Sequence, residues 1–394
     1  MQEFGQVIRE YGKTRSMWRK VKMNKKIKVG IIGTGMIANC AHLPSLDILR
    51  KEGLVDIVGV ADIRIDAARE TAERWDVPNY YEDPQQLLDE LKPDFVAVCT
   101  PNIPHKEWTI KALKAGAHVA CEKPMAVTVA DAKEMWDASR KYGKTLFPCQ
   151  AMRWRNYMQH SKALVETGEL GEVYFSDLEF IRRIGFPTWG YFHMKDYNYG
   201  GPFCDIGVHL IDCLLWIIGD KKVEAVSGST YTKIANQKED ILISLAESGA
   251  YGGEFTPREY NPDEYDVEDF ATGFLRLEGG MSVNFKFAWA INLPTTNLDM
   301  VICGDKGGLH VNKEKLYKNI GKYQSECEMK WFDNGKYKGV NFEQHRYMYR
   351  NMINTLLGKE EYLVKEHQNM EVIKAIECFY KSAELGREVR VDEL

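Results

Sequence analysis

A glycine-containing turn near the start of the chain constrains the fold more than any other feature. It directly follows the apolar run of residues 27–32 and reads Gly33-Thr34-Gly35-Met36-Ile37-Ala38. Between a strand and a helix, this G-x-G-x-x-A spacing predicts a dinucleotide-binding βαβ unit. Gly33 permits the tight turn, Gly35 lets the backbone approach a pyrophosphate, and Ala38 keeps helix and strand close. We expect the diphosphate at the helix N-terminus, where free N–H groups attract negative charge.

An acidic residue ends the second expected strand. Asp62 closes the run of residues 54–62, and a carboxylate there can accept hydrogen bonds from both ribose hydroxyls of the adenosine half. This favours NAD, because a 2′-phosphate would meet the negative charge. Arg64 can offset part of that charge, so NADP stays an alternative. A glycine-containing turn of some other α/β protein is the second alternative.

The first half of the chain alternates short β-branched runs with helical stretches, which is typical of parallel βαβ units. We expect buried parallel strands, apolar on both faces, at residues 27–32, 54–61, 95–99, 118–121 and 145–148. Helical spacing of apolar residues predicts helices at 43–50, 66–74, 84–91, 105–115 and 129–142. Asp83 is expected to cap the third helix, and Gly143 to end the last. The pattern predicts a doubly wound sheet.

After about residue 150 the expected strands lengthen, alternate in polarity and follow one another directly, at residues 173–183, 223–233, 267–277, 281–289 and 297–303. This predicts an antiparallel sheet with one face exposed to solvent. We also expect a hairpin turn at Glu278-Gly279-Gly280 and a surface loop at 249–265. The predicted fold class is therefore α/β, with a Rossmann domain (24–149) and an α+β domain on a large open, mainly antiparallel sheet (150–394). Residues 1–23 are expected to be an extension outside the fold.

Composition and charge indicate a small-molecule partner. The 394 residues carry a net charge of -5 without a basic cluster, which argues against nucleic-acid binding. The nine cysteines are scattered singly, as is typical of a reducing cytoplasm. We expect no membrane span and no signal peptide, because no apolar run is long enough.

The sequence resembles the Gfo/Idh/MocA oxidoreductase family from about Lys25 to near its end. The resemblance rests on the glycine turn and on three further motifs, which are Cys99-Thr100-Pro101-Asn102 with His105, Glu122-Lys123-Pro124, and Gly200-Gly201-Pro202-Phe203-Cys204-Asp205-Ile206-Gly207-Val208-His209 with Asp212. It implies a Rossmann domain followed by an open-sheet substrate domain. It also implies a homo-oligomer, a dimer or tetramer or higher, that associates through the outer face of the sheet.

The resemblance implies that Lys123 meets the substrate hydroxyl. Lys123 follows the fourth expected strand, at the sheet edge where doubly wound folds bind ligands. An ammonium group there stabilises developing alkoxide character. The alternative is a solvated lysine at a strand end.

Asp205 and His209 are four residues apart, so on a helix both side chains leave the same face. Imidazole titrates near neutral pH, and we assign His209 as the general acid/base. The resemblance implies that Asp205 orients it or binds the neighbouring hydroxyl. A metal site formed with Asp212 is an alternative, but we expect no metal and read Asp212 as a structural partner.

Further contacts are also implied by the resemblance. Thr100, Asn102 and His105 are expected to line the nicotinamide ribose, and Glu122 to contribute to the cofactor site; His105 can equally be a helix-start residue. Arg153 and Trp154 are candidates for the substrate pocket, against core packing for Trp154 and a surface pair for Arg153. Trp189 lies in an aromatic run that can stack on sugar rings or can belong to the core or an interface.

The predicted function is NAD(H)-dependent oxidation of a ring secondary hydroxyl of a sugar, glycoside or cyclitol to a ketone. Family branches acting at the glucoside 3-position look most similar, through residues 187–190 and 200–209. Inositol dehydrogenase is one alternative. Another is an NAD-dependent glycosidase or lyase that oxidises the sugar transiently and keeps its cofactor tightly bound. A non-catalytic NAD-binding module is the third.

Overall fold

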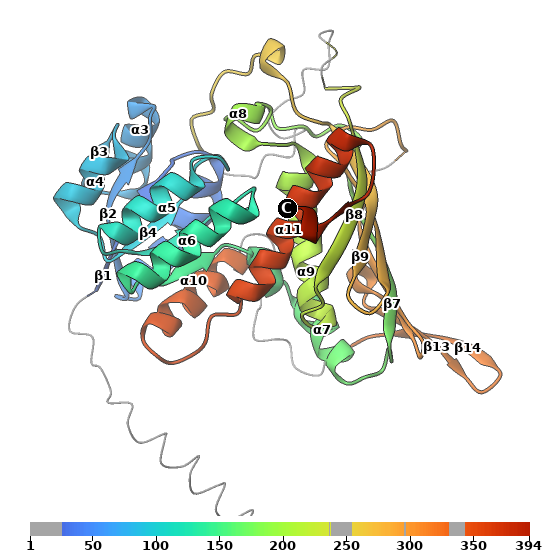
Figure 1. Cartoon of the computed structure of the whole chain (residues 1–394). Helices are drawn as coiled ribbons and strands as arrows, with labels where there is room; N and C mark the ends of the chain where they lie inside the picture. Colours follow the sequence, from blue (N-terminus) through green and yellow to red (C-terminus); the bar gives the residue numbers. More distant parts are fainter. Residues whose placement is uncertain (1–25, 236, 238–253, 295–296, 331–342) are drawn as a thin grey trace, which may run out of the picture.

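The chain forms two β-sheets, one in each half of the molecule, with helices between them (Figure 1). The structure, a computed structural model, describes residues 26–235, 237, 254–294, 297–330 and 343–394. The N-terminal extension expected at residues 1–23 lies outside the described residues, as does the first part of the loop expected at 249–265.

The first sheet has six parallel strands in the order β3-β2-β1-β4-β5-β6. Its strands are β1 (Ile27–Ile32), β2 (Val55–Ala61), β3 (Tyr80–Tyr81), β4 (Phe95–Val98), β5 (His118–Cys121) and β6 (Leu146–Pro148). β1, β4, β5 and β6 are almost wholly buried, as strands covered on both faces must be. The predicted doubly wound sheet is confirmed.

The helices of this half are α2 (Leu43–Lys51), α3 (Ile65–Trp75), α4 (Pro84–Leu91), α5 (His105–Lys114) and α6 (Val129–Tyr142). The predicted start and stop signals operate as expected. The Asp83 carboxylate accepts a hydrogen bond from the backbone N–H of Gln85, and Gly143 ends α6 with φ of 62°.

The second sheet has nine strands in the order β14-β13-β12-β11-β7-β10-β9-β8-β15. Their bounds are β7 (Val173–Ile181), β8 (Val223–Tyr231), β9 (Phe270–Leu277), β10 (Met281–Ala288), β11 (Asn297–Gly304), β12 (Gly308–His310), β13 (Lys315–Ile320), β14 (Tyr323–Glu328) and β15 (Val389–Arg390). β9 and β10 form the predicted hairpin, in which Gly279 and Gly280 both adopt positive φ. The sheet is mixed, because β7 and β10 run parallel while every other neighbouring pair is antiparallel.

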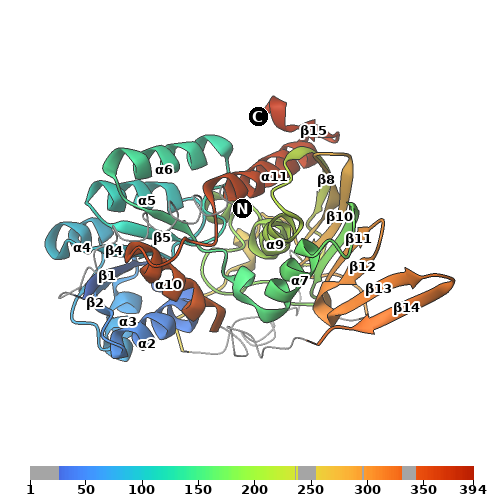
Figure 2. The same cartoon turned by 90° about the horizontal axis from the view of Figure 1, so that it is seen from below.

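Helices α7 (Asn156–Glu166), α9 (Val208–Ile218) and α11 (Glu366–Leu385) cover one face of the second sheet, with α9 between the other two (Figure 2). Phe203, just before α9, stacks on Phe379 of α11 with ring centroids 3.9 Å apart. Among the described residues, one helical stretch, Lys195–Ile218, which includes the short α8 (Lys195–Asn198), is long and apolar enough to span a membrane. Its most apolar window is 83% buried, as in the core helix of a globular protein.

The chain returns to the Rossmann half near its end, which the sequence did not predict. Helix α10 (Glu343–Leu356) packs against α2, and Met348, Tyr349 and Met352 are fully buried in the same apolar cluster as β1 and β2. Parts of the chain about 300 residues apart therefore share one core.

Candidate active site

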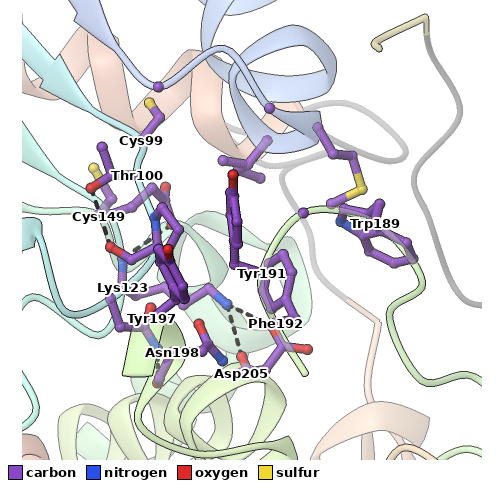
Figure 3. A pocket seen from close by; sticks show the side chains of 18 of the residues that line it. Cys99, Thr100, Lys123, Cys149, Trp189, Tyr191, Phe192, Tyr197, Asn198 and Asp205 are labelled. Atoms are coloured by element: carbon purple, nitrogen blue, oxygen red, sulfur yellow. Dashed lines mark hydrogen bonds and ion pairs between the residues drawn. The ribbon is translucent and has the colours of Figure 1, made fainter. Parts of the chain in front are cut away.

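A cavity of about 380 Å³ lies where the carboxyl ends of the Rossmann strands face the second half of the molecule (Figure 3). Its wall combines the glycine turn, the loops after β2, β4 and β5, and the turn that precedes α9. This is the edge at which doubly wound sheets bind ligands.

The glycine turn has room for a diphosphate. Gly33 adopts φ of +92°, and a Cβ added there would lie 2.6 Å from the carbonyl oxygen of Cys99, so only glycine fits. A Cβ added to Gly35 would meet nothing within 4 Å, and Gly35 lines the cavity together with Met36 and Ile37. The backbone is thus open to a ligand where the dinucleotide motif requires it.

Thr34 was expected to contact the cofactor, but it does not line the cavity and instead holds Asp62 in place. It is 1% exposed, and its backbone N–H and hydroxyl both donate to Asp62 Oδ2, at 2.8 and 3.1 Å. The other carboxylate oxygen accepts from the backbone N–H of Arg64 at 2.9 Å. Asp62 is therefore held at the cavity wall with a fixed orientation, as an acceptor for ribose hydroxyls must be.

A segment of the second half reaches over the adenosine end of the cavity. Residues 255–258 line the cavity there, together with Asp62 and Arg64. The Arg64 guanidinium donates to the carbonyl oxygen of Thr256 at 2.7 Å, and the Thr256 hydroxyl contacts the Glu70 carboxylate of α3. The two halves are thus joined across this end of the site.

The loop after β4 links both halves near the expected nicotinamide site. Thr100 and Asn102 line the cavity, and the Asn102 amide donates to the carbonyl oxygen of Asn198 at 2.8 Å. His105 is fully buried, does not line the cavity and is the first residue of α5, so the structure places it at a helix start and not at the expected cofactor site. Its ring nitrogens face the carbonyl oxygens of Pro124 and Thr100 at 2.8 and 3.0 Å, so it holds the two loops together from behind.

Lys123 and Asp205 meet in the cavity from opposite halves (Figure 3). The Lys123 ammonium donates to Asp205 Oδ1 and to its main-chain oxygen, both at 2.9 Å, and Asp205 Oδ2 accepts from Trp289 Nε1 at 2.9 Å. Burial alone would raise the pKa of Asp205, but the charge of Lys123 and these hydrogen bonds hold it below its usual value. Trp289 directly follows β10 and was missed from the sequence because its partner Asp205 lies 84 residues away.

His209 lies in the same cavity wall, and its imidazole is partly buried and neutral. Burial, followed by the charge of Lys123, lowers the pKa of His209 to about 3. Its Nδ1 has no hydrogen-bond partner in the described part of the chain. No hydrogen bond joins Asp205 to His209 among the described residues, and the two Asp205 oxygens pair with Lys123 and Trp289, so the carboxylate orients the lysine. Its expected contact with a neighbouring hydroxyl stays a prediction.

A π-helical turn at the start of α9 positions Asp205 and His209. Residues Phe203–Gly207 form a π-helix that runs into α9, and the Val208 N–H bonds to the Phe203 carbonyl, five residues back. Such turns often occur at functional sites, because they displace side chains from the regular helical pattern. The predicted helix exists, and Asp205 and His209 both face the cavity from it.

Aromatic side chains form the wall beside Lys123 (Figure 3). Tyr191 and Tyr197 stack with centroids 4.4 Å apart, and the Arg258 guanidinium lies over Tyr191. The predicted Trp189 lines the cavity too, although it is 4% exposed and packs against Met36.

Arg153 and Trp154 lie outside the cavity, contrary to their predicted substrate contacts. Arg153 is fully buried and forms two 2.7 Å hydrogen bonds with the Asp212 carboxylate. Trp154 is 2% exposed and packs against Tyr362 in the Rossmann core. Asp212 is thus a structural partner, as the sequence suggested.

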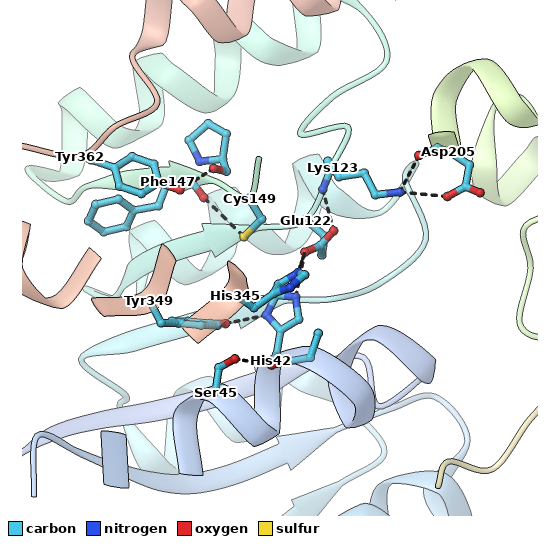
Figure 4. Close-up of polar contacts among 12 residues, drawn as sticks. His42, Ser45, Glu122, Lys123, Phe147, Cys149, Asp205, His345, Tyr349 and Tyr362 are labelled. Carbon is cyan, nitrogen blue, oxygen red and sulfur yellow. Dashed lines mark hydrogen bonds and ion pairs between the residues drawn. The ribbon is translucent and has the colours of Figure 1, made fainter. Parts of the chain in front are cut away.

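Glu122 joins the cavity wall to a buried polar cluster (Figure 4). Its Oε1 lies 2.8 Å from His42 Nε2, and its Oε2 accepts from the backbone N–H of Lys123 at 3.1 Å. Burial would raise the pKa of Glu122, but the hydrogen bond and charge of His42 outweigh it and lower that pKa to about 2. Glu122 is thus a carboxylate in the cavity wall, and its contribution to the cofactor site stays a prediction.

Family models match both halves of the chain. Residues 27–149 match the model described as "Oxidoreductase family, NAD-binding Rossmann fold", and residues 162–391 match "Oxidoreductase family, C-terminal alpha/beta domain". A D-glucoside 3-dehydrogenase of Escherichia coli (strain K12) is 32% identical over 93% of this chain and 97% of its own length.

Other relatives share shorter stretches or only the fold. A myo-inositol 2-dehydrogenase of Thermotoga maritima is 28% identical over 57% of this chain and 67% of its own length. Among solved structures, a levoglucosan dehydrogenase in complex with NADH is similar with a TM-score of 0.75 at 18% identity, covering 93% of this chain and 99% of its own. The second half of the chain therefore has the architecture found in sugar-oxidising relatives.

Proposed function

The chain belongs to the Gfo/Idh/MocA oxidoreductase family and is an NAD(P)-dependent dehydrogenase acting on CH–OH groups. We propose that it oxidises the 3-hydroxyl of a glucoside to a ketone. The observation that carries the proposal is the cavity in which Lys123, Asp205 and His209 meet beside the glycine turn. The similarity to D-glucoside 3-dehydrogenase extends over almost the whole of both chains.

In this proposal, Gly33, Gly35 and Asp62 hold the dinucleotide, which supplies the hydride acceptor when bound. Lys123 donates a hydrogen bond to the reacting hydroxyl and stabilises the negative charge that develops on its oxygen. Asp205 orients the lysine through Oδ1, and Trp289 fixes Asp205 through Oδ2. His209, whose imidazole is neutral, accepts the hydroxyl proton.

We assign NAD and not NADP as the working cofactor. The Asp62 carboxylate faces the cavity with its orientation fixed by Thr34 and Arg64, and it would repel a 2′-phosphate. The guanidinium of Arg64 bonds to Thr256, which reduces its availability to a phosphate. The contacts of Thr256 with Arg64 and Glu70 also support slow release of the cofactor, because the dinucleotide would have to pass them.

The aromatic wall and the comparisons support a glucoside as the substrate. Tyr197, stacked on Tyr191, lines the cavity, and its uncovered ring face is one on which a sugar ring or an aglycone can stack. The resemblance to the inositol dehydrogenase covers 57% of this chain, against 93% for the glucoside enzyme.

A substrate panel tests the assignment. The purified chain is incubated with NAD and, separately, with glucose, methyl glucosides, a disaccharide and inositols, and NADH absorbance and the position of the product ketone are measured. We expect turnover of the glucosides with a 3-keto product. Turnover of inositols alone would reject the glucoside assignment, and glycoside cleavage without net NADH would indicate the lyase alternative.

We further propose that the enzyme is a cytoplasmic homo-oligomer. The nine cysteines are scattered singly along the chain, without a C-x-x-C pair, as is typical of proteins of a reducing compartment. Tyr174, Tyr231 and Tyr317 are 56%, 42% and 40% exposed on strands of the second sheet, whose other face is covered by helices. Apolar groups on an open sheet face favour association. Sedimentation velocity at micromolar concentration should give a dimer or larger species, and a monomer alone would contradict this.

A further inference from the structure

Three side chains of metal-binding type converge beneath the catalytic lysine (Figure 4). His42 is the last residue of the π-helix η1 (Ala38–His42) that precedes α2, Glu122 directly follows β5, and His345 lies near the start of α10. One ligand atom of each lies within 4.8 Å of the others, and the side chains are 0%, 6% and 7% exposed. Three separate elements thus bring two imidazoles and a carboxylate into one buried cluster.

Direct contacts leave this cluster incompletely bonded. His42 Nε2 lies 2.8 Å from Glu122 Oε1, which is a hydrogen bond. His345 Nε2 lies 4.0 Å from the same oxygen, too far for a hydrogen bond, and its Nδ1 has no hydrogen-bond partner in the described residues. A buried imidazole nitrogen without a partner is unfavourable, because it has lost its bond to water.

We propose that His42, Glu122 and His345 bind a divalent transition-metal ion such as Zn²⁺. Bonds of about 2.0–2.2 Å to a tetrahedral ion place two ligand atoms roughly 3.3 Å apart. The two separations from Glu122 Oε1, 2.8 Å and 4.0 Å, lie on either side of that value, so small side-chain rotations suffice. Two imidazoles and one carboxylate are a donor set that zinc accepts with a fourth position left open.

The contacts around the cluster orient its ligands. The Tyr349 hydroxyl lies 2.6 Å from His42 Nδ1, so it can accept the Nδ1 proton while Nε2 faces the ion. The backbone N–H of Lys123 holds the second oxygen of Glu122. Tyr349 is fully buried in the Rossmann core and cannot easily move.

The ion would have two consequences for the molecule. It would tie α10 to the Rossmann half, because His345 belongs to α10 while His42 and Glu122 do not. Its open position would face the cavity, since Glu122 and His345 both line it. The dehydrogenase function proposed above does not require this ion, so each proposal can fail without the other.

Metal titration of the full-length chain tests the inference. The protein is treated with a chelator, dialysed, and titrated with Zn²⁺ by calorimetry and with Co²⁺ by visible absorption. We expect one ion per chain, d–d bands typical of a low-coordinate Co²⁺ site, and a higher Tm with Zn²⁺. Affinity should fall at least tenfold in His345→Ala and in His42→Ala. His160→Ala is the matched control, because His160 pairs with Glu314 away from the cavity, and it should bind like the wild type.

A second variant covers the case in which His345→Ala or His42→Ala does not fold. In His345→Cys, a thiolate-to-cobalt charge-transfer band should appear only if residue 345 contacts the ion. Wild-type protein that binds neither ion, or binding that is unchanged in the alanine variants, would overturn the proposal and leave a hydrogen-bonded cluster only. NADH formation, measured in parallel on the chelated protein, reports separately on the proposed function.

Discussion

The ammonium nitrogen of Lys123 lies 2.9 Å from both Oδ1 and the main-chain oxygen of Asp205, so a charged contact joins the two halves of the molecule inside the cavity. Lys123 follows a Rossmann strand, whereas Asp205 lies on the π-helical turn of the second half. The proposed catalytic arrangement therefore depends on how the two halves dock, as well as on the residues present.

Replacing Lys123 should impair the reaction and leave cofactor binding largely intact. Lys123→Met removes the donor to the reacting oxygen, and we expect kcat to fall by about 10²–10³-fold, as for other preorganised donors. Steady-state kinetics and NADH fluorescence titration separate the two effects. Lys106→Met is the control, because Lys106 pairs with Asp131 and Glu134 outside the cavity. Full turnover by Lys123→Met would disprove its role.

The partly buried imidazole of His209 should make the fold sensitive to acid, because its pKa is lowered in the folded chain. Its pKa is about 3 in the folded chain and about 6.5 when unfolded, so between these values only the unfolded chain binds the proton. Stability should therefore be lost as pH falls below about 6.5, by about 1.4 kcal/mol per pH unit for this group. Urea unfolding of His209→Gln against pH should show a shallower loss than the wild type.

His367→Gln is the control for that measurement, because the His367 side chain is 63% exposed. Its stability profile should run parallel to that of the wild type. If the free energy of unfolding changes equally with pH in the wild type and in His209→Gln, the pKa of His209 is not lowered in the folded chain.

Asp62 should govern the choice between cofactors. Asp62→Ser removes the carboxylate that faces the adenosine end, and we expect the ratio of kcat/KM for NAD over NADP to fall about 10-fold or more, which is the effect of one or two hydrogen bonds to a charged group. The ratio is measured with one glucoside at fixed pH. If the ratio of kcat/KM for NAD over NADP is unchanged in Asp62→Ser, the adenosine ribose does not bind at Asp62.

The Arg153–Asp212 pair should matter for stability and not for substrate binding. Arg153→Met leaves the Asp212 carboxylate buried without a partner, which destabilises a protein by about 3–5 kcal/mol. Urea unfolding measures this, and the double variant with Asp212→Leu should recover part of the loss. Arg140→Met, whose partners Asp137 and Glu366 are exposed, should change stability little. A raised KM for the substrate in folded Arg153→Met, without lost stability, would support the substrate contact that the sequence analysis predicted for Arg153.

Local patterns were sufficient to predict most of the Rossmann half. Apolar runs, Asp83 and Gly143 determine strands and helix ends through contacts within a few residues, and the structure has them where expected. The parallel pairing of β7 with β10 could not be predicted, because it depends on which strands meet after the intervening helices and strands. The return of α10 to the Rossmann core is long-range for the same reason.

The same limit applies to the site. Lys123, Asp205 and His209 belong to sequence motifs and do line one cavity. Trp289 and His345 carry no local signal, since their partners lie 84 residues away or more. Arg153 was misassigned because burial against Asp212 cannot be read from the residues next to it.

We propose that hydride is removed from a glucoside in the cavity that Lys123 and His209 both line. It is tested most directly by NADH absorbance and product analysis with a methyl glucoside, for the wild type and His209→Asn side by side. The account predicts a 3-keto product from the wild type and a fall in kcat of about 10²–10⁴-fold in the variant, as for loss of a general base. Equal turnover by both proteins, or no oxidation of any glucoside by the wild type, would contradict it.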